Sequence, residues 1–503
     1  MSVVESSEPD TADRVPAAAS IRTPVAWWPV LTVAAVAAGI HLAVATRYGW
    51  HRDEFYYVIC GRHPDWGYVD QPPLAPLLAR LLAAMPGGLF PLRAAAVAAQ
   101  LGCVLLTAAL AAEFGGRRRA QLIAAGSVAA APGFVASSLL FGTTVLDQLV
   151  WAVVLVLVVR ALRLGTVRAW LPAGVAAGIG LEIKDTVAVL ILGIAVGLML
   201  FRRSALRTPG PWLAAGVTVL FAVPNLVWDA RHQWANLRMA ETLSRNQGGF
   251  LGAAAHLPIL LFLLAGPPLV ALWIAGVRRL GATTGHRWVL ATVVTAVALC
   301  TAGGGKSYYA LPVLFALFAS GAVAVEQAAT ARGRVGWPLA VGLSGLVAVL
   351  IGLPVLPPHT AAALRPIDPQ VVETYGWPDF VDQVAAAAAP LPPDVPIFTS
   401  NYGEAGALTT FGPSHGLHRP VYSAHNNYLL WGPPPGTPDT VLCVGEWKPP
   451  LLQRFWSQVS ELAPITAGDG VTDEETAAHA AIYLCERPRG TWAELWPGLR
   501  HLD

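Results

Sequence analysis

Acidic side chains concentrate in one stretch of a chain that is otherwise poor in charge. Asp53 and Glu54 are adjacent, and Asp70 follows directly before the rigid turn Gln71-Pro72-Pro73. Two carboxylates above a cavity serve as a general base and an orienting partner, or they hold a divalent cation. The other interpretation is a solvated loop whose charges face water. The aromatic and proline residues around the acids favour a packed loop.

A second candidate site is the segment GGGKSYYALP, residues 303–312, which contains one of only three lysines in the chain. All other basic residues are arginines, so a lysine at position 306 is a distinctive choice. The compact ammonium of Lys306, beside Tyr308 and Tyr309, suits a lipid phosphate. The alternative is a lysine that extends from a helix end to the lipid headgroups.

Charged residues also interrupt the long apolar stretch 170–201. Glu182, Lys184 and Asp185 stand midway along it, so we expect a hairpin of two short helices. An internal ion pair is the plain role of these charges, because ionisable groups within a membrane are usually paired or functional. The alternative is that Lys184 contacts a phosphate or the acidic loop.

Two polar segments lie in the last quarter of the chain. Glu404, in SNYGEAGAL, follows a predicted strand and a glycine, which indicates a helix start. His425, Asn426, Asn427 and Trp431, in YSAHNNYLLWGPPP, form a cluster of the type that stacks on sugars and hydrogen-bonds to them. Packing within a turn is the alternative for this cluster.

The composition is that of a membrane protein. The chain has 503 residues, of which 55% are hydrophobic and 13% are charged, and its mean hydropathy is +0.53. Soluble proteins carry about 25% charged residues, so an ordinary soluble enzyme and a disordered chain are both excluded. The net charge of +2 provides no basic patch for a nucleic acid. The five cysteines form no CxxC and no zinc spacing, so no metal site is assigned.

Crossing a bilayer takes about 20 apolar residues in a helix. Nine apolar runs and the hairpin predict a polytopic all-α bundle of about 11 membrane segments, with the runs near 26–46, 90–113, 120–139, 145–163, 211–228, 251–277, 286–302, 308–328 and 336–357. The arginine-rich loops fall on one side when the N-terminus is cytoplasmic. The loop 47–89 and the C-terminal part then lie outside. Residues 1–25 are expected to be a disordered cytoplasmic tail, and residues 26–358 the membrane domain.

The long apolar runs stop before the last segment, residues 359–503. VPIFTS (395–400), TVLCVG (440–445) and AIYLCE (481–486) predict strands, and LLQRFWSQVSEL (451–462) predicts an amphipathic helix. This alternation predicts a small extracytoplasmic α/β domain. Cys443 and Cys485 lie in two of the predicted strands, either as buried thiols or as a disulfide.

Three motifs together carry a family resemblance. They are Asp53-Glu54-Phe55-Tyr56-Tyr57, Trp66-Gly67-Tyr68-Val69-Asp70-Gln71-Pro72-Pro73-Leu74 and Gly305-Lys306-Ser307-Tyr308-Tyr309. In this order they resemble the bacterial members of glycosyltransferase family 39. That family includes the protein O-mannosyltransferases and the transferase that adds aminoarabinose to lipid A. The resemblance runs from the first span through about residue 330.

The resemblance implies a C-type glycosyltransferase fold whose site faces outward from a bacterial plasma membrane. The implied donor is a sugar on a polyprenyl phosphate. Asp53 matches the catalytic carboxylate of the family and Asp70 the second one, with Glu54 beside them. Relatives often carry a lysine where this chain has Gln71, which shifts phosphate binding to other cations.

The candidates for binding the donor phosphate are Lys306, Arg52, His51, Tyr308 and Tyr309. The candidates for other substrate contacts are Tyr57, Trp66, Tyr68, Gln71, Lys184, Glu404, His425, Asn426, Asn427 and Trp431.

The predicted function is an integral-membrane glycosyltransferase that inverts the anomeric centre and uses an outer-loop aspartate as base. The acceptor is a glycan, a lipid or a protein, and the sequence does not assign it. A divalent cation remains open as a cofactor. The expected partners are the lipid-linked donor and membrane lipids, without a nucleic acid. The alternatives are a secondary transporter and a non-catalytic glycan-binding membrane protein.

Overall fold

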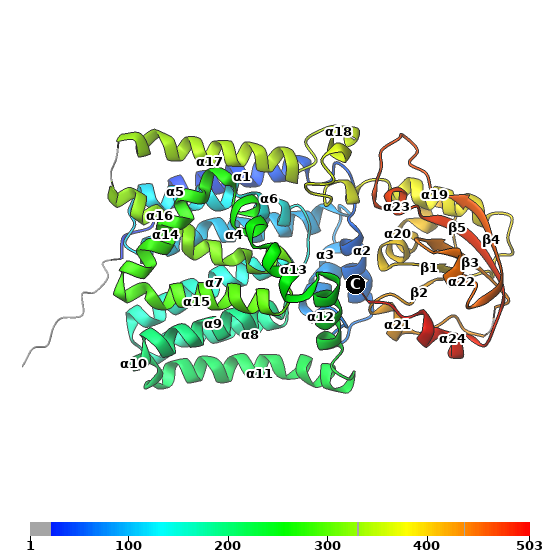
Figure 1. The fold of residues 1–503 in the computed structure, drawn as a ribbon, viewed down its shortest axis with the longest axis horizontal. Coiled ribbons are helices and arrows are strands. Elements are labelled where there is room, and N and C mark those ends of the chain that lie inside the picture. The colour runs from blue at the N-terminus through cyan, green and yellow to red at the C-terminus, as the bar shows by residue number, and fades with distance from the viewer. Residues whose placement is uncertain (1–21, 329–330, 437, 503) are drawn as a thin grey trace, which may run out of the picture.

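The structure is a computed structural model that describes residues 22–328, 331–436 and 438–502. Most of the expected N-terminal tail, residues 1–21, lies outside the described residues. The chain forms a helical bundle with a smaller sheet domain at one end (Figure 1). The predicted fold class is confirmed.

Long apolar helices make the chain a multi-pass membrane protein. Among the described residues, seven helices are long and apolar enough to cross a membrane, or up to eight if a bent pair counts as one span. The expected count of 11 is not confirmed. These spans are formed by α1 (Trp27–Val44), α4 (Phe90–Glu113), α7 (Thr143–Leu164), α11 (Pro209–Arg231), α15 (Arg287–Ala302) with the 3-10 turn before it, α16 (Leu314–Ala328) with the 3-10 helix before it, and α17 (Ala331–Gly352).

Shorter helices fill the bundle between the long ones. The stretch 170–201 forms α8 (Leu171–Leu181) and α9 (Thr186–Phe201), which are separated at the charged residues as predicted. The remaining short helices are α5 (Arg118–Ala130), α6 (Pro132–Ser137), α10 (Arg203–Leu206), α12 (Ala235–Asn246), α13 (Gly249–Ala255) and α14 (Val270–Ala282).

The expectation of one continuous span at 251–277 is wrong. The chain there forms α13, a π-helical segment (Ile259–Leu264), a 3-10 turn (Pro267–Leu269) and α14. Gly266 has a φ of +88° and is followed by prolines, which end a helix. Hydropathy alone does not register these breaks.

The sheet domain contains five strands in the order β2-β1-β3-β5-β4. β1 pairs in parallel with β2 and β3, whereas β5 pairs antiparallel with β3 and β4. The strands are β1 (Ile397–Thr399), β2 (Val421–Ser423), β3 (Thr440–Gly445), β4 (Trp456–Pro464) and β5 (Ala481–Pro488). The helices of this domain are α18 (Pro358–Ala363), α19 (Trp377–Ala388), α20 (Tyr402–Phe411), α21 (Tyr428–Trp431), α22 (Pro449–Leu452), α23 (Glu474–Ala477) and α24 (Trp492–Leu499).

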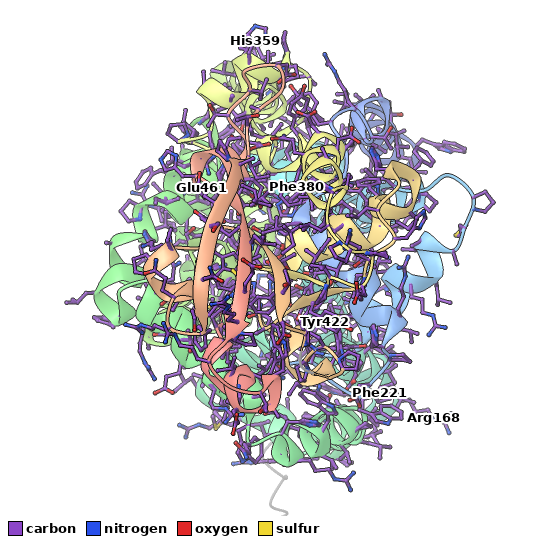
Figure 2. The ribbon with its side chains drawn as sticks, turned by 90° about the vertical axis from the view of Figure 1, so that its right-hand side faces the viewer. Arg168, Phe221, His359, Phe380, Tyr422 and Glu461 are labelled. Atoms are coloured by element: carbon purple, nitrogen blue, oxygen red, sulfur yellow. The ribbon has the colours of Figure 1, made fainter. Side chains whose placement is uncertain are left out.

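The three predicted strands are confirmed, but the predicted helix over 451–462 is wrong. Residues 449–452 form the short α22, residues 453–455 form a turn, and the edge strand β4 begins at Trp456. Leu452, Phe455, Trp456 and Val459 follow helical spacing, yet pairing with β5 satisfies the backbone of this segment. Cys443 and Cys485 are free, buried thiols in the same sheet. Figure 2 looks onto this domain and labels Glu461 on its edge strand.

The loop with the acidic residues lies at the junction of bundle and sheet domain. Residues 47–89, here called the acidic loop, contain α2 (Arg52–Arg62) and α3 (Leu74–Ala83). Helix α2 packs against α3 and against α20 of the sheet domain. Figure 1 shows both short helices between the two parts.

Candidate active site

Helix α2 begins with a capping box that positions the first acid. His51 Nδ1 accepts a hydrogen bond from the backbone N–H of Asp53 at 3.1 Å. Glu54 in turn accepts one from the backbone N–H of His51 at 3.0 Å. The positive end of the helix favours acidic residues in this first turn. Asp53 therefore lies at a defined place, with 41% of its side chain exposed.

Glu54 forms a buried ion pair with Arg93, so its carboxylate is not accessible to a substrate. Arg93 of α4 donates to its two oxygens at 2.6 and 2.7 Å, and the backbone N–H of Phe141 donates at 3.0 Å. The residue is fully buried. Glu54 thus anchors the acidic loop to the bundle, and its predicted catalytic role becomes a positioning role because its oxygens are occupied.

Asp53 is held as a carboxylate by its neighbours. Its Oδ1 accepts a 2.8 Å hydrogen bond from the hydroxyl of Tyr402 in α20. Burial alone would raise the pKa of Asp53, but the neighbouring His51 ring, the positive charges of Arg52 and Lys306 and the Tyr402 hydroxyl lower it below its usual value. The side chain is therefore ionised at neutral pH.

The pKa of Asp70 is shifted in the opposite direction from that of Asp53. Burial raises its pKa to about 7, and the negative charge of Asp53 adds to that rise. Tyr56 donates to Oδ1 at 3.0 Å, and Asn426 donates to Oδ2 at 3.2 Å, which limits the shift. Two carboxylates whose pKa values are pushed apart are typical of sites with divided acid–base roles.

Two stacked tyrosines connect the carboxylates. The rings of Tyr56, from α2, and Tyr402, from the sheet domain, have centroids 4.5 Å apart and an interplanar angle of 26°. Each hydroxyl donates to one of the two acids, Tyr402 to Asp53 and Tyr56 to Asp70. The packing of the sheet domain on α2 therefore sets the positions of both acids.

The His-Asn-Asn segment is part of this junction. The ring of His425 stacks on Tyr402 with centroids 4.8 Å apart. Asn427 accepts from the backbone N–H of Val69 at 3.2 Å, and Asn426 reaches Asp70. All three residues of the segment are buried. The sequence left sugar binding and packing as the two interpretations of this cluster, and these three residues are packed within the protein.

Trp431 has a different environment from the rest of that cluster. Its ring stacks on His63, at the end of α2, with centroids 4.4 Å apart. Both residues line a cavity of about 390 Å³ together with Arg62, Tyr422 and Tyr428. Trp431 therefore presents an aromatic wall to an open space.

Glu404 starts a helix, as its plain interpretation predicted. It accepts hydrogen bonds from the backbone N–H of Asn401 at 2.9 Å and from the hydroxyl of Ser400 at 2.8 Å. The residue is fully buried in the capping box of α20. It contributes to the site by fixing the helix that carries Tyr402.

His51 and Arg52 face acids of the sheet domain. His51 Nε2 lies 3.1 Å from a carboxylate oxygen of Glu373. Arg52 forms an ion pair with Glu474 and lies 4.7 Å above the ring of Tyr402. The Arg52 charge and the His51 ring act on Asp53, while both side chains join the two parts of the molecule. Because His51 and Arg52 already contact carboxylates of the sheet domain, they are weaker candidates for binding a phosphate than the sequence suggested.

The lysines gather on the bundle side of the site. Lys306 precedes a 3-10 helix (Ser307–Val313), and its charge lies within electrostatic reach of Asp53 and Lys184. The ammonium of Lys184 donates to Thr144 at 3.0 Å and lies 5.4 and 5.0 Å from the ring centroids of Tyr308 and Tyr309.

Lys184 has no carboxylate within ion-pair distance in the part of the chain that the structure describes. The tip of its hairpin is joined to the acidic loop, since the N–H of Leu74 donates to the carbonyl of Glu182 at 2.9 Å. This backbone contact involves none of the three charged groups, so the role of Lys184 stays a prediction. Lys184 thus meets two tyrosines, and Lys306 lies within electrostatic reach of both Lys184 and Asp53.

The other candidates of the acidic loop mainly hold its shape. Tyr68 is buried and donates to the carbonyl of Cys60 at 2.9 Å, and buried Gln71 pairs with Tyr68 through the backbone. Tyr57 shares a 3.3 Å hydrogen bond with Thr143 and lies within electrostatic reach of Asp53. Trp66 is 64% exposed on the surface.

A metal centre has little support. Across residues 22–328, 331–436 and 438–502, no three His, Cys, Asp or Glu side chains gather in a group that could hold a metal ion. The carboxylate of Glu54, one of the three acids considered for a cation, is saturated by Arg93 and Phe141.

Several functional residues escaped the sequence analysis. Tyr402 and Tyr56 lie within quoted motifs, but nothing local shows that their hydroxyls reach the two acids. Arg93 is the one basic residue of the mainly apolar α4, and a buried charge of this kind requires a partner. That signal could have identified the Glu54–Arg93 pair.

Comparison with known proteins agrees with the sequence motifs. Residues 70–228 match the family described as dolichyl-phosphate-mannose-protein mannosyltransferase. Crystal structures of ArnT from Cupriavidus metallidurans in the apo state and bound to undecaprenyl phosphate superpose with TM-scores of 0.60 and 0.59. Each is 14% identical and covers 90% of this chain and 97% of its own. No curated protein matches the chain. The resemblance to glycosyltransferase family 39 is thus confirmed, and the chain has the C-type glycosyltransferase fold.

Proposed function

We propose that the chain transfers a sugar from a polyprenyl-phosphate donor to an acceptor on the outer side of the membrane. The observation that carries this proposal is the pairing of an ionised Asp53 with Asp70, of pKa about 7, beside Lys306 and Lys184. The likeness to ArnT supports it, because one of those structures is bound to undecaprenyl phosphate.

The donor phosphate lies between Lys306 and Lys184 in this proposal. Their ammonium groups stabilise the charge that develops on the leaving polyprenyl phosphate, an effect that is large where water is excluded. Tyr308 and Tyr309 flank Lys184 and restrict its position. The polyprenyl chain lies among the apolar helices.

Asp53 acts as the base. It takes the proton from the acceptor hydroxyl or amine as the acceptor atom forms its bond to the anomeric carbon. The bond from that carbon to the phosphate oxygen breaks, and its electron pair leaves with polyprenyl phosphate. One displacement inverts the configuration, without a covalent sugar–enzyme intermediate. Asp70 holds Tyr56 and Asn426, and through them the geometry around Asp53.

The acceptor approaches along the junction of bundle and sheet domain. The cavity beside Trp431, Tyr428 and Arg62 offers aromatic walls with a cation at the rim, a combination suited to a saccharide or another polar acceptor. Its position at the end of α2 places it on the same helix as Asp53.

The proposal is tested by donor turnover. The purified protein receives a panel of polyprenyl-phosphate sugars together with a membrane extract that supplies acceptors, and mass spectrometry detects released polyprenyl phosphate. Release for one sugar supports the reaction class and identifies the donor. Sugars left intact across a broad panel contradict it and favour the transporter or glycan-binding alternatives.

A further inference from the structure

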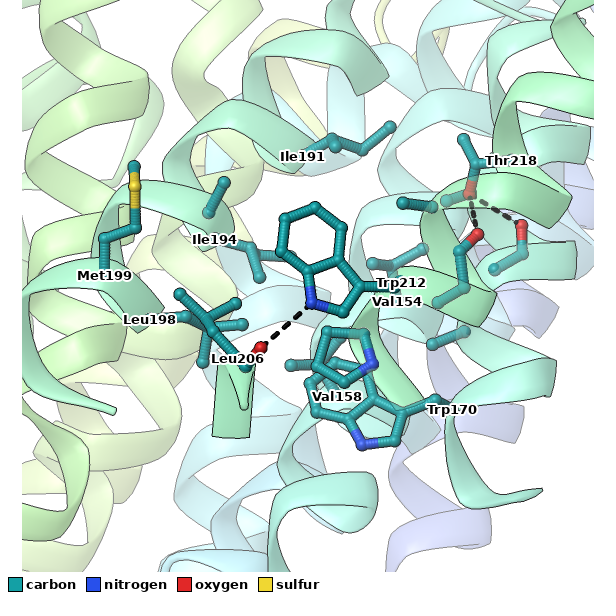
Figure 3. A pocket seen from close by; sticks show the side chains of 17 residues that line it. Val154, Val158, Trp170, Ile191, Ile194, Leu198, Met199, Leu206, Trp212 and Thr218 are labelled. Atoms are coloured by element: carbon teal, nitrogen blue, oxygen red, sulfur yellow. Dashed lines mark hydrogen bonds between the residues drawn. The ribbon is translucent and has the colours of Figure 1, made fainter. Parts of the chain in front are cut away.

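An apolar cavity lies far from the acidic loop, at the end of the bundle that carries α10 (Figure 3). It has a volume of about 210 Å³ and lies between α7, α8, α9 and α11. Its walls include Val158, Trp170, Ile194, Leu198, Met199 and Trp212. None of the described residues that line it is charged.

Two polar side chains that border this cavity are hydrogen-bonded within the protein. The indole N–H of Trp212 donates to the carbonyl of Leu206 at 2.9 Å. The hydroxyl of Thr218 donates to the carbonyls of Gly174 and Ala214 at 3.0 and 2.9 Å. Figure 3 shows both groups turned to these carbonyls. An apolar cavity of this kind disfavours water and is suited to hydrocarbon.

Two exposed arginines lie in the segments that border this cavity. Arg168 lies in the 3-10 turn (Val167–Trp170) before α8, and Arg207 lies between α10 and α11. Both side chains are exposed. No acidic residue occurs in 165–170 or 202–212, the two segments that border the cavity. The surface beside the cavity is therefore positive.

We propose that this cavity and its arginine rim bind an anionic phospholipid. One acyl chain fills the space beside Trp212, and the headgroup phosphate pairs with Arg168 and Arg207. Arginines clustered beside membrane helices attract anionic headgroups, and a guanidinium is suited to phosphate. The site lies at the opposite end of the bundle from Asp53, so it is distinct from the donor site and does not depend on the proposed function.

The test compares lipids that share acyl chains but differ in headgroup charge. Delipidated protein in neutral detergent is titrated with phosphatidylglycerol or phosphatidylcholine, and native mass spectrometry and thermal unfolding report binding. We expect phosphatidylglycerol to bind more tightly and to raise the unfolding temperature more than phosphatidylcholine does. Equal binding of the two lipids would overturn the assignment of the headgroup.

Variants separate the rim from the cavity. Arg168→Gln/Arg207→Gln should weaken phosphatidylglycerol binding roughly tenfold or more, whereas the matched loop pair Arg117→Gln/Arg118→Gln should leave it unchanged. Ala195→Leu, which fills part of the cavity from a half-buried position, should weaken binding of both lipids without unfolding the protein. Unchanged binding in both the rim and the cavity variants would overturn the site.

Discussion

The hydroxyl of Tyr402 donates a 2.8 Å hydrogen bond to Oδ1 of Asp53, although the two residues are 349 positions apart in the chain. Tyr402 belongs to the sheet domain, whereas Asp53 lies in the acidic loop beside the bundle. The sheet domain therefore contributes directly to the setting of the proposed base.

Replacing this donor should impair turnover without unfolding the protein. In Tyr402→Phe, the Asp53 carboxylate loses one stabilising hydrogen bond, its pKa rises, and its orientation is less restricted. We expect kcat to fall about tenfold, since a net hydrogen bond to a charged group is worth about 1.5–3 kcal/mol, while the KM for the donor changes little. Tyr483→Phe, in β5, is the control and should keep its activity. A Tyr402→Phe protein with unchanged kcat would refute the positioning role.

The activity should rise with pH through about 7. Burial raises the pKa of Asp70 to that value, so the carboxylate that accepts from Tyr56 and Asn426 forms only above it. Removing a hydrogen-bond donor to the Asp70 carboxylate raises the pKa of Asp70 further, so the rise in activity moves to higher pH. Asn426 has a φ of +47°, so Asn426→Gly removes the amide and keeps the backbone conformation. The pH profiles of kcat/KM for the wild type and the variant provide the measurement. If kcat/KM rises over the same pH range in both proteins, the rise does not reflect the ionisation of Asp70.

The lysines offer a matched set of three substitutions. Lys306→Ala and Lys184→Ala should each weaken binding of polyprenyl phosphate by about tenfold or more, because each removes a charge-assisted contact to the phosphate. Lys448 is exposed in the sheet domain, and Lys448→Ala should bind as the wild type does. Fluorescence or calorimetric titration of the lipid phosphate measures the three affinities. Equal affinities of the three variants for polyprenyl phosphate would mean that residues other than Lys306 and Lys184 bind the phosphate.

The buried pair of Glu54 and Arg93 should dominate the stability of the acidic loop. Arg93→Met leaves an uncompensated buried carboxylate, which typically costs about 3–5 kcal/mol. The exposed pair of Glu241 and Arg245 in α12 provides the comparison, and Arg245→Met should cost roughly 0.5 kcal/mol or less. Thermal unfolding in the same detergent measures both. Similar losses for the two variants would mean that Glu54 retains a charge partner or takes up a proton.

The sequence predicted those parts of the site that local patterns encode. The acidic loop, the interrupted hairpin and the Lys306 segment each show an unusual residue against an apolar background, and the structure brings them together. The strands β1, β3 and β5 were also readable, because short apolar runs between turn residues are typical of buried strands.

The remaining parts depend on contacts that no local pattern contains. The hydrogen bond from Tyr402 to Asp53 forms only when α20 packs on α2, and the His425–Asn427 segment became a junction for the same reason. β4 has helical spacing of its apolar residues but pairs with the free edge of β5. The break near Gly266 reflects backbone conformation, which hydropathy does not measure.

The most direct test of the central claim is single-turnover release of polyprenyl phosphate by wild type, Asp53→Asn and Asp65→Asn. Asp65 is an exposed acid of the same loop, so its variant controls for the lost charge. The account predicts release by wild type and Asp65→Asn, with a loss of about 10²–10⁴-fold in Asp53→Asn at unchanged donor affinity. Release by Asp53→Asn at the wild-type rate would contradict it.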